Sequence, residues 1–560
     1  MNKVLKNAGL AGLLLFAAAQ GFAQTSAKKS ESVPQGWHLM DATQDGYYGI
    51  SVEKAYQELL KGRKSYPVIV AVIDSGVDTL HEDLKPVFWI NPKEIPGNGI
   101  DDDKNGYVDD VYGWNFIGGK DGRNVKEDSY EAARVYHKLK QKFGNPEGKD
   151  TSSWASDPDY ATWIKVKNEV GGKPKAAAGQ VFAMKKALEN FVKADSTLRT
   201  EMGKAEFTGH ELEKFEATTQ EGKTARMAFL GMLKGNDMMD MTNVKFLDEF
   251  TKYVKGEEDK LEAADKAPEN FRGNIVQDNY EDFNDRYYGN ADVMASTPFH
   301  GTHVSGIIGA KRDNNLGING IADNVRIMTI RAVPDGDEHD KDIALAIRYA
   351  VDNGAKVINM SFGKSYSPEK YWVDDAVKYA ASKGVLLVHA AGNDAKNVDV
   401  EDNFPNPYIK VDGSRAPNFI TVGASGDPKA GGFTASFSNY GKNTVDVFAP
   451  GVKIYSTIPG GNTYGNAQGT SMASPVVAGL AALILQYYPK LTATQVKEII
   501  EKSAVAPPSN VRKPGTSEQV PMSELCRTGG IVNAYEAIKL ADEMYGSKKL
   551  KSKLKSRKKG

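Results

Sequence analysis

Short hydrophobic runs that do not alternate with polar residues recur along the chain between residues 67 and 424. Five of them read PVIVAVID at 67–74, RIMTIRAV at 326–333, KVINMS at 356–361, GVLLVHAAGN at 384–393 and FITVGA at 419–424. Runs of this kind are typical of strands buried on both faces, as in a parallel sheet covered by helices. We therefore predict a mainly parallel central sheet with strands at these places.

Amphipathic segments fill the intervals between the runs. DIALAIRYAVDNG at 342–354 and WVDDAVKYAASKG at 372–384 have the period of a helix, and each closes on a glycine where a helix C-cap belongs. Strands that alternate with helices favour an α/β fold. We assign residues 47–116 and 272–546 to one discontinuous α/β domain.

The stretch from 117 to 271 interrupts this rhythm, because it is charged, poor in β-branched runs and helical in period. Its apolar residues fall on helix faces, one with Ala132, Val135, Tyr136, Leu139 and Phe143, another with Val181, Met184, Leu188, Phe191 and Leu198. We predict an inserted, mostly helical subdomain at 117–271. Its role is open between a lid over a cleft and a peripheral appendage. Its methionines, Met227, Met232, Met238, Met239 and Met241, suit either a core or an adaptable contact surface.

The first 23 residues have the features of a secretory signal peptide: Lys3 and Lys6, an apolar run at 8–19, and small residues at Gly21 and Ala23. We expect an exported protein, periplasmic or extracellular, whose mature chain begins near Gln24. The apolar run is too short to span a bilayer, and we expect no transmembrane segment. Residues 24–46 form a short N-terminal segment, too short for a folded prodomain.

Charge is unevenly distributed along the chain, whose formal net charge is −1. Eight Lys and Arg residues gather at 548–559, which leaves an acidic body with a basic tail at 547–560. The tail is either solvated or in contact with an anionic surface. We expect no specific nucleic-acid binding and a monomer. Cys526 is alone and so forms no intramolecular disulfide.

Two histidines, His300 and His303, stand three positions apart in STPFHGTHVSGIIGA at 296–310. On a helix they share a face, which suits a metal pair, but one imidazole alone suits a general base. A metallopeptidase of the H-E-x-x-H type needs a glutamate between its histidines, and here no Glu lies between them. The pair is better interpreted as one base, His300, and one packing residue, His303.

Polar residues stand where strands end or helices begin. Asp74 ends the first run, Asn393 ends the fourth, His300 opens a buried helix, and Ser471 opens a long apolar helix. Ligand sites of α/β sheets lie at the carboxyl ends of the strands, so these side chains are expected to meet. An acid, a histidine and a serine together supply an orienter, a base and a nucleophile, and Asn393 supplies an amide donor for an oxyanion.

The chain order Asp, His, Ser is one of the orders found for this geometry. An α/β-hydrolase would instead need G-x-S-x-G, and Gly469-Thr470-Ser471-Met472-Ala473 lacks the last glycine. A binding module on an inactive scaffold would have lost one of the four residues, and none is lost.

Five segments, AVIDSGVDTLHEDL, HGTHVSGIIGA, VINMSFG, LLVHAAGN and GTSMASPVVAG, resemble the signature blocks of the subtilases, the subtilisin-like serine endopeptidases. The resemblance implies a subtilisin-like three-layer fold and a secreted serine endopeptidase that acts on polypeptides through an acyl-enzyme, with no catalytic metal. It implies a catalytic triad of Asp74, His300 and Ser471 with Asn393 as the oxyanion donor. The chain departs from the family's pattern in the long insertion between Asp74 and His300.

The resemblance also implies substrate-binding residues. Ser361, Phe362 and Gly363 match the family's edge strand, to which an extended substrate adds as another strand. Ala390, Ala391 and Gly392 match the wall of the pocket for the residue before the scissile bond. Gly336 matches the second substrate-binding strand, and its neighbours Asp337 and Glu338 suggest the hypothesis that basic substrate side chains are favoured there.

The segment NGIDDDKNGYVDDVYG at 98–113 is rich in oxygen ligands. Its candidate calcium ligands are Asp101, Asp103, Asn105, Asp109 and Asp110, with Gly106 at the turn. Alternating hard oxygen ligands before a turn suit Ca²⁺, but an EF-hand needs Glu where Tyr112 stands. A solvated acidic turn is the alternative. Subtilases often bind calcium, which favours a structural calcium site.

Overall fold

The structure is a computed structural model that describes residues 33–145, 151, 153–172, 175–235, 238–239 and 241–546. The predicted signal peptide and basic tail lie outside the described residues. The chain divides into two compact units, and each is described by itself. The smaller unit comprises residues 129–269, and the larger one comprises residues 33–128 and 270–546 of the described chain.

The larger unit is built on a seven-stranded sheet in the order β2-β3-β1-β4-β5-β6-β7, and every neighbouring pair is parallel. The strands are β1 (Val68–Asp74), β2 (Gly113–Asn115), β3 (Val325–Arg331), β4 (Val357–Met360), β5 (Leu386–Ala390), β6 (Phe419–Ser425) and β7 (Val447–Pro450). The five apolar runs coincide with β1, β3, β4, β5 and β6. The prediction of an α/β fold with a mainly parallel sheet is therefore confirmed.

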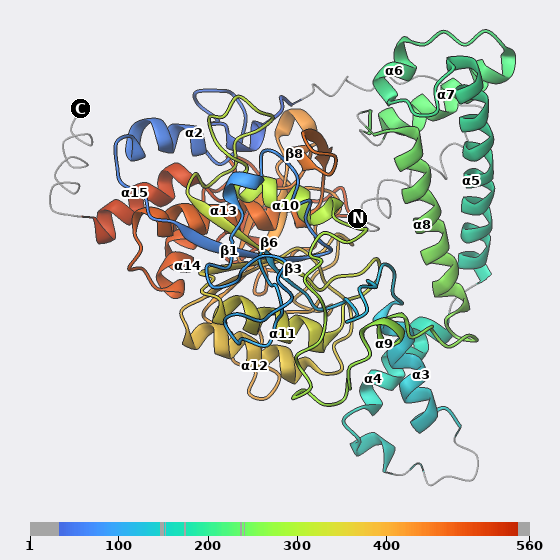
Figure 1. Cartoon of the computed structure of the whole chain (residues 1–560). Coiled ribbons are helices and arrows are strands. Elements are labelled where there is room, and N and C mark those ends of the chain that lie inside the picture. Colours follow the sequence, from blue (N-terminus) through green and yellow to red (C-terminus); the bar gives the residue numbers. More distant parts are fainter. Residues whose placement is uncertain are drawn as a thin grey trace. The chain divides into compact units, whose positions relative to one another are not determined.

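Helices cover both faces of the sheet (Figure 1). Successive residues of a strand point to opposite faces, so each apolar strand contributes side chains to two cores. Val70 and Val72 of β1 face one core, and Ala71 and Ile73 face the other. The first face carries α10 (Phe299–Gly309), α13 (Thr470–Tyr487), α14 (Ala493–Lys502) and α15 (Ala534–Tyr545); the second carries α11 (Asp340–Asp352) and α12 (Lys370–Ser382).

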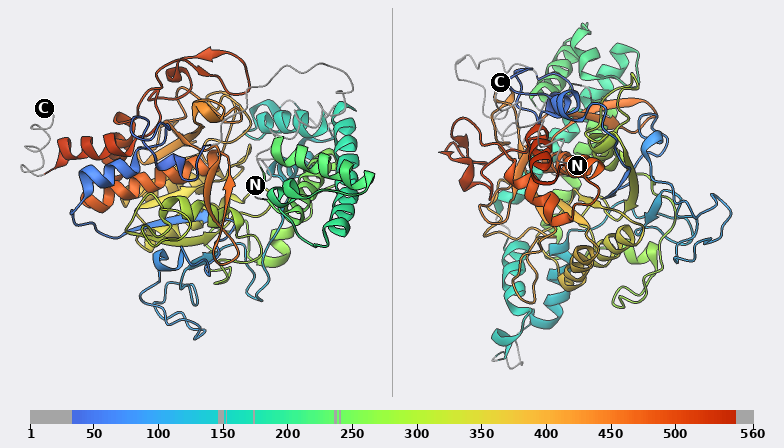
Figure 2. Two further views of the ribbon diagram at one scale, coloured as in Figure 1. Left: turned by 90° about the horizontal axis from the view of Figure 1, so that it is seen from above. Right: turned by 90° about the vertical axis from the view of Figure 1, so that its left-hand side faces the viewer.

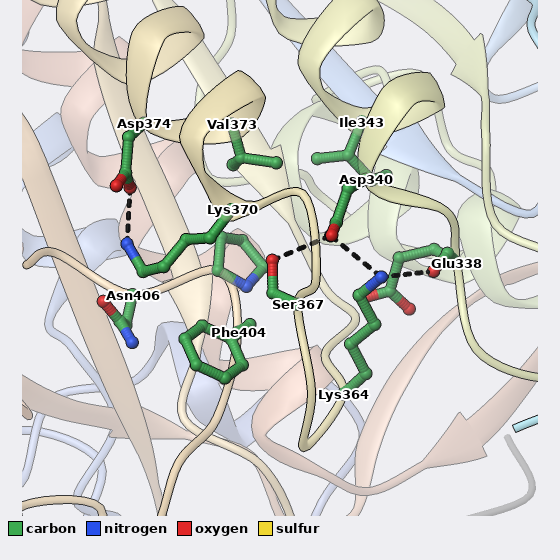
Figure 3. Close-up of a pocket in the computed structure, with 11 residues that line it drawn as sticks. Glu338, Asp340, Ile343, Lys364, Ser367, Lys370, Val373, Asp374, Phe404 and Asn406 are labelled. Carbon is green, nitrogen blue, oxygen red and sulfur yellow. Dashed lines mark hydrogen bonds and ion pairs between the residues drawn. The ribbon is translucent and has the colours of Figure 1, made fainter. Parts of the chain in front are cut away.

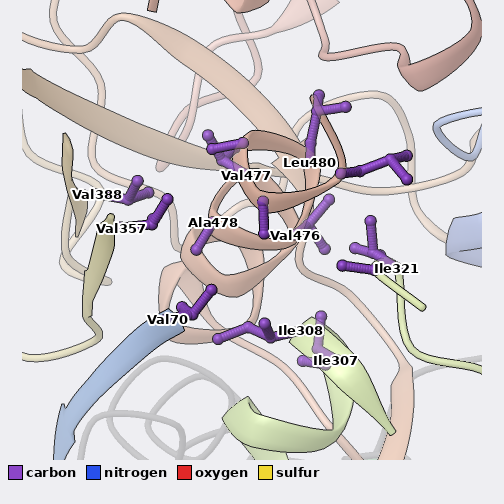
Figure 4. Packing of buried hydrophobic residues seen from close by; sticks show 14 of the residues in the cluster. Val70, Ile307, Ile308, Ile321, Val357, Val388, Val476, Val477, Ala478 and Leu480 are labelled. Carbon is purple, nitrogen blue, oxygen red and sulfur yellow. The ribbon is translucent and has the colours of Figure 1, made fainter. Parts of the chain in front are cut away.

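Helix α13 lies at the centre of the first core. Figure 4 shows Val476, Val477 and Leu480 among residues of β1, β4, β5 and α10. By length and composition α13 could cross a bilayer, but 89% of its residues are buried, as expected for a core helix. The smaller elements are α2 (Val52–Ala55), α9 (Phe271–Val276), the hairpin β8 (Ile454–Ile458) and β9 (Thr463–Ala467), and the pair β10 (Val511–Arg512) and β11 (Gln519–Val520).

The N-terminal segment packs on the larger unit. Trp37 is fully buried, and its indole N–H donates to the carbonyls of Val452 and Lys453, at 3.1 and 3.2 Å. Helix α2 follows beside α15, as both views of Figure 2 show, where the Ala534 amide donates to the Ile50 carbonyl at 2.7 Å. Residues 33–46 are therefore part of this unit rather than a separate leader.

The smaller unit is helical, with α3 (Glu131–Phe143), α4 (Tyr160–Val166), α5 (Lys175–Met202), α6 (Gly209–Lys214), α7 (Gln220–Gly235) and α8 (Asn243–Glu262). Its core is rich in phenylalanine and includes Phe229, Phe246 and Phe250. Four of the methionines pack at the margin of this core, and Met227 is 68% exposed.

The smaller unit begins at Ser129 and ends at Glu269, within the predicted 117–271. At the first boundary, Ile117 and Val125 enter the core of the larger unit. At the second, Arg272 is buried against Asp342 of α11.

The segments that flank the inserted stretch are joined to each other by Asn115 and Asn290. Each donates its backbone N–H to the other's carbonyl, at 3.0 and 3.1 Å, and Asn115 Nδ2 donates to Asn290 Oδ1 at 2.9 Å. We call this pairing the asparagine clasp. It closes the insertion loop within the larger unit.

Candidate active site

Asp74 and His300 are joined by a hydrogen bond at the carboxyl end of β1. The Nδ1–H of His300 donates to Asp74 Oδ1 at 2.8 Å and to Oδ2 at 3.0 Å. A carboxylate only accepts, so the proton is assigned to Nδ1, and Nε2 of the neutral ring is left as a base. Gly301 allows this approach, since a Cβ there would stand 2.2 Å from the carbonyl oxygen of Gly76.

Ser471 lies in the first turn of α13 and contacts the segment that follows β4. Its Oγ–H donates to the Ser361 carbonyl at 3.1 Å, and Ser361 Oγ–H donates to the Ser471 carbonyl at 2.9 Å. Among the described residues, no hydrogen bond joins Ser471 to His300. Such contacts are often loose without substrate, and rotation about the Cα–Cβ bond of Ser471 releases its hydroxyl from Ser361.

Asn393 follows β5 and is oriented by Thr470. Its Oδ1 accepts from the backbone N–H and the hydroxyl of Thr470, at 2.8 and 2.9 Å. A Cβ on Gly469 would lie 3.5 Å from Asn393 Nδ2 and 3.6 Å from the Ser471 nitrogen. The two N–H donors therefore border one space, kept clear by a glycine with φ of 149°. Two such donors at a helix N-terminus suit a developing oxyanion.

Three of these residues end or follow adjacent strands of the sheet, and His300 and Ser471 lie in the first turns of α10 and α13. Asp74 ends β1, Ser361 follows β4 and Asn393 follows β5, and β1, β4 and β5 are neighbours in the sheet. The parallel order thus brings the predicted residues to one edge.

The segment Ser361-Phe362-Gly363 is braced by its neighbours. The Phe362 carbonyl accepts from His389 Nε2 at 2.8 Å, and Lys364 pairs with Phe404 through two backbone hydrogen bonds of 3.0 and 2.8 Å. His389 on β5 had no assigned role in the sequence, because a histidine within an apolar run gives no indication of its partner.

The predicted pocket wall lies at the end of β5, where Ala390 is the last strand residue and Ala391 and Gly392 follow it. Ala391 is fully buried and packs with Val445 and Phe448. Its carbonyl accepts from Asn403 and Asn439, at 3.0 and 2.9 Å. Ala390 is 3% exposed, and Gly392, with φ of 101°, is partly exposed. Of the three, Gly392 is the most exposed.

Gly336 lies against the chain itself. A Cβ there would stand 2.0 Å from the Asp128 carbonyl oxygen, and the neighbouring Asp335 pairs with Lys126 and Asp128 through hydrogen bonds of 2.8 and 3.0 Å. The backbone at residues 335–336 is thus covered on one side by residues 126–128. Glu338 is only 2% exposed, whereas Asp337 is partly exposed, so Asp337 is the more accessible of the two carboxylates in our hypothesis.

A pocket lies near this segment, between the N-termini of α11 and α12 and the loop at Phe404 (Figure 3). Two ion pairs line it. Lys364 Nζ lies 2.9 Å from Asp340 Oδ1, and Lys370 contacts Asp374. Charges of both signs therefore line the pocket, where Glu338 adds a third carboxylate to the two ion pairs.

His303 has a structural environment. It is fully buried, and its Nε2 lies 3.0 Å from the Ile454 carbonyl and 3.1 Å from the Gly465 carbonyl. Burial lowers its pKa to about 3. These contacts with the β8–β9 hairpin give no support to a metal shared with His300.

In the acidic segment, carboxylate oxygens of Glu94, Asp101 and Asp103 lie within 4.8 Å of one another. Glu94 was not predicted, because it stands upstream of the alternating pattern. Its Oε1 accepts from the amides of Asp102 and Asp103, at 3.0 and 3.2 Å. Its buried Oε2 has no hydrogen-bond partner among the described residues.

The other predicted ligands serve the loop itself. Asp109 accepts from the backbone N–H groups of residues 97, 98 and 99 at 2.8 to 3.2 Å. Asp110 is fully buried, where it accepts from Tyr349, Asn91 and Asn105; burial raises its pKa to about 6. The predicted ligand set with Asn105, Asp109 and Asp110 stays a prediction, and the carboxylates that converge in the structure are Glu94, Asp101 and Asp103.

Comparison with known proteins gives a consistent result. A family model described as "Subtilase family" matches residues 66–520. The thermophilic serine proteinase of Bacillus sp. (strain AK1) is 46% identical over 204 residues, which cover 36% of this chain and 45% of the relative. Subtilisin DY of Bacillus licheniformis is 40% identical over 207 residues, which cover 37% of this chain and 70% of the relative.

A solved protease structure from Pseudoalteromonas arctica is 31% identical, with a TM-score of 0.35, over 43% of this chain and 70% of that one. The chain thus spans less than half of the first relative and 70% of the second.

Proposed function

From the premise that this chain belongs to the subtilase family, we propose that it is a serine endopeptidase that hydrolyses peptide bonds through an acyl-enzyme intermediate. The observation that carries the proposal is the hydrogen bond from His300 Nδ1–H to Asp74, beside the carboxyl ends of the strands that lead to Ser361 and Asn393. This bond leaves His300 Nε2 to act as the base.

In the proposed mechanism, His300 Nε2 takes the proton of Ser471 as Oγ attacks the substrate carbonyl. Asp74 holds the imidazole in the required tautomer and stabilises its charged form. His300 then gives the proton to the leaving amine, and the amine departs. Water, activated by the same imidazole, releases the acyl group from Ser471 Oγ.

The negative charge that develops on the carbonyl oxygen is bound by Asn393 Nδ2 and the Ser471 backbone N–H. Thr470 holds the amide oxygen of Asn393 through two hydrogen bonds, so the NH₂ group is set in place before the reaction. Donors fixed in advance need no reorganisation as the charge appears.

Polypeptides are the proposed substrates. An extended chain adds to the Ser361–Gly363 segment as a further strand, held by backbone hydrogen bonds. The hydrogen bond of His389 to Phe362 and those of Lys364 to Phe404 hold this segment in place.

We also propose a structural calcium ion held by Glu94, Asp101 and Asp103. Hard carboxylate oxygens suit Ca²⁺, and the buried Glu94 Oε2 without a hydrogen-bond partner is the observation that fits a bound cation. The ion would neutralise the loop at 94–103 and has no part in the chemistry. For localisation, we propose export directed by residues 1–23.

The test is labelling by a fluorophosphonate, together with casein hydrolysis, for the wild type and Ser471→Ala. We expect both activities to vanish in the variant. Ser474→Ala is the matched control, because Ser474 lies in the same helix and binds Asn359 Oδ1 at 2.8 Å rather than any of the four proposed catalytic residues; it should keep its labelling. Labelling that survives Ser471→Ala, or hydrolysis that only a zinc chelator stops, would overturn the proposal.

A further inference from the structure

Arg331 is a fully buried cation at the end of β3. It pairs in register with Asp74, the last residue of β1, and its exposed fraction is 0%. Arginine is almost never fully buried without a charged partner. Within the described residues, no carboxylate lies at ion-pair distance from Arg331, so its place in the interior needs another explanation.

The guanidinium donates to four neutral oxygens. Nε–H donates to the Ser75 carbonyl at 3.0 Å, and Nη1–H donates to Asn115 Oδ1 at 3.2 Å. The Nη2 group donates to the Val125 carbonyl and to Thr297 Oγ1, the latter at 3.3 Å. One side chain thus joins four segments of the chain, at Ser75, Asn115, Val125 and Thr297.

Two of these segments carry the Asp74–His300 pair. Ser75 follows Asp74 directly, and Thr297 precedes His300 by one turn. Ser75 and Thr297 also bind each other, since each hydroxyl donates to the other's carbonyl, at 2.8 and 3.0 Å. Arg331 adds two further hydrogen bonds to this pair of loops, one to the Ser75 carbonyl and one to Thr297 Oγ1.

The other two segments are the entrance to the insertion. Asn115 belongs to the asparagine clasp, and Val125 lies shortly before the smaller unit begins at Ser129. The same guanidinium therefore fixes the entrance of the inserted stretch and the two loops of the Asp74–His300 pair.

Placing this charge in the interior is costly. Burial lowers the pKa of Arg331 to about 10, an effect that Asp292 and Asp335 partly offset. An apolar side chain of similar volume often does as well or better for stability than a buried charge. An apolar residue cannot, however, supply the N–H donors that the planar guanidinium of Arg331 holds in fixed directions.

We infer that Arg331 is the positioning residue that sets the geometry of the Asp74–His300 pair and couples it to the entrance of the insertion. The inference rests on the proposed function, because the pair matters only if it activates Ser471. A displacement of about 1 Å in a catalytic group can cost about 10²-fold in rate.

The test compares Arg331→Met and Arg331→Lys with the control Arg272→Met. Arg272 is also buried, at 2% exposure, but it binds Asp278 and Asp342 and touches neither loop of the pair. We expect Arg331→Met to lower kcat about 10²-fold with KM little changed, and Arg331→Lys about tenfold. Arg272→Met should lower the Tm and leave kcat near the wild-type value.

A second measurement is independent of turnover. The Nδ1–H proton of His300, bound to Asp74, should give a far-downfield proton resonance. We expect this signal to shift or broaden in Arg331→Met and to persist in Arg272→Met. Circular dichroism at the assay temperature establishes that each variant is folded, and Arg331→Lys keeps the test open if Arg331→Met does not fold.

The outcomes separate the two proposals. If Ser471→Ala stays active, the proposed function fails. If Ser471→Ala is inactive while Arg331→Met keeps its kcat and its downfield signal, only the role of Arg331 is wrong. If Arg272→Met loses as much kcat as Arg331→Met, the effect is general to buried arginines, and the inference is also wrong.

Discussion

Replacing His38 by leucine should make the protein more resistant to acid. His38 lies in the short turn Trp37–Leu39 and is 0% exposed. Neither ring nitrogen has a hydrogen-bond partner among the described residues. Burial lowers the pKa of His38 to about 4, from an ordinary value of 6.5. The native state therefore keeps this ring neutral where the unfolded chain would protonate it.

The sign and size of the effect follow from proton linkage. Below pH 6.5 the unfolded state binds a proton at His38 that the native state does not, so the free energy of unfolding falls with pH until about pH 4. Above pH 6.5, His38 causes no loss in the free energy of unfolding. Below it, the loss linked to His38 grows by about 1.4 kcal/mol per pH unit and reaches about 3 kcal/mol by pH 4. Leucine removes this loss. It also removes a buried N–H without a partner, which costs about 1 to 3 kcal/mol at neutral pH.

The assay is chemical denaturation at several values between pH 7 and pH 4, in a Ser471→Ala background that prevents self-digestion. The wild type and His38→Leu should diverge as pH falls, and the variant should be the more stable at pH 4.5. His210→Leu, on the surface of the smaller unit, is the control and should parallel the wild type. Parallel curves for the wild type and His38→Leu would refute the reasoning, since the buried ring would then have no linked proton.

Three further predictions concern the site and the loop. Asp74→Asn should lower kcat about 10⁴-fold toward a peptide substrate, because an amide stabilises the imidazolium poorly; a loss below tenfold would count against the triad. Asn393→Leu should lower kcat about 10²- to 10³-fold with KM nearly unchanged, and a change confined to KM would contradict the oxyanion role. Added Ca²⁺ should raise the Tm of the wild type but not of Glu94→Gln, with the exposed Asp121→Asn as a control that keeps the response; an equal rise in Glu94→Gln would exclude the site.

The sheet was predictable because its central strands are buried on both faces and so lack alternation. β2 and β7 were missed, since three and four residues are too few to stand out from loops. The approach of Asp74 to His300 was expected because ligand sites of α/β sheets lie where strands end and helices begin. The orientation of the Ser471 hydroxyl could not be predicted, because it donates to Ser361, which lies 110 positions away in the sequence.

The acidic segment shows a different limit. Its sequence reveals the density of carboxylates but not where backbone N–H groups point. Asp109 is occupied by three such groups, and Glu94 joins Asp101 only through the fold of the loop. Likewise, Arg331 at the end of an apolar run gave no sign of its four acceptors, which lie 34 to 256 positions away.

The asparagine clasp has a consequence for how this chain tolerates its insertion. Asp74 and His300 are 226 positions apart, yet loop-closure entropy grows only by about 0.6 kcal/mol for each doubling of loop length. With Asn115 and Asn290 paired, the stretch at 129–269 belongs to a loop that is already closed within the larger unit. A longer or shorter stretch at 129–269 should therefore change the free energy of folding only slightly, because the Asn115–Asn290 pairing and the core residues that flank it stay in place.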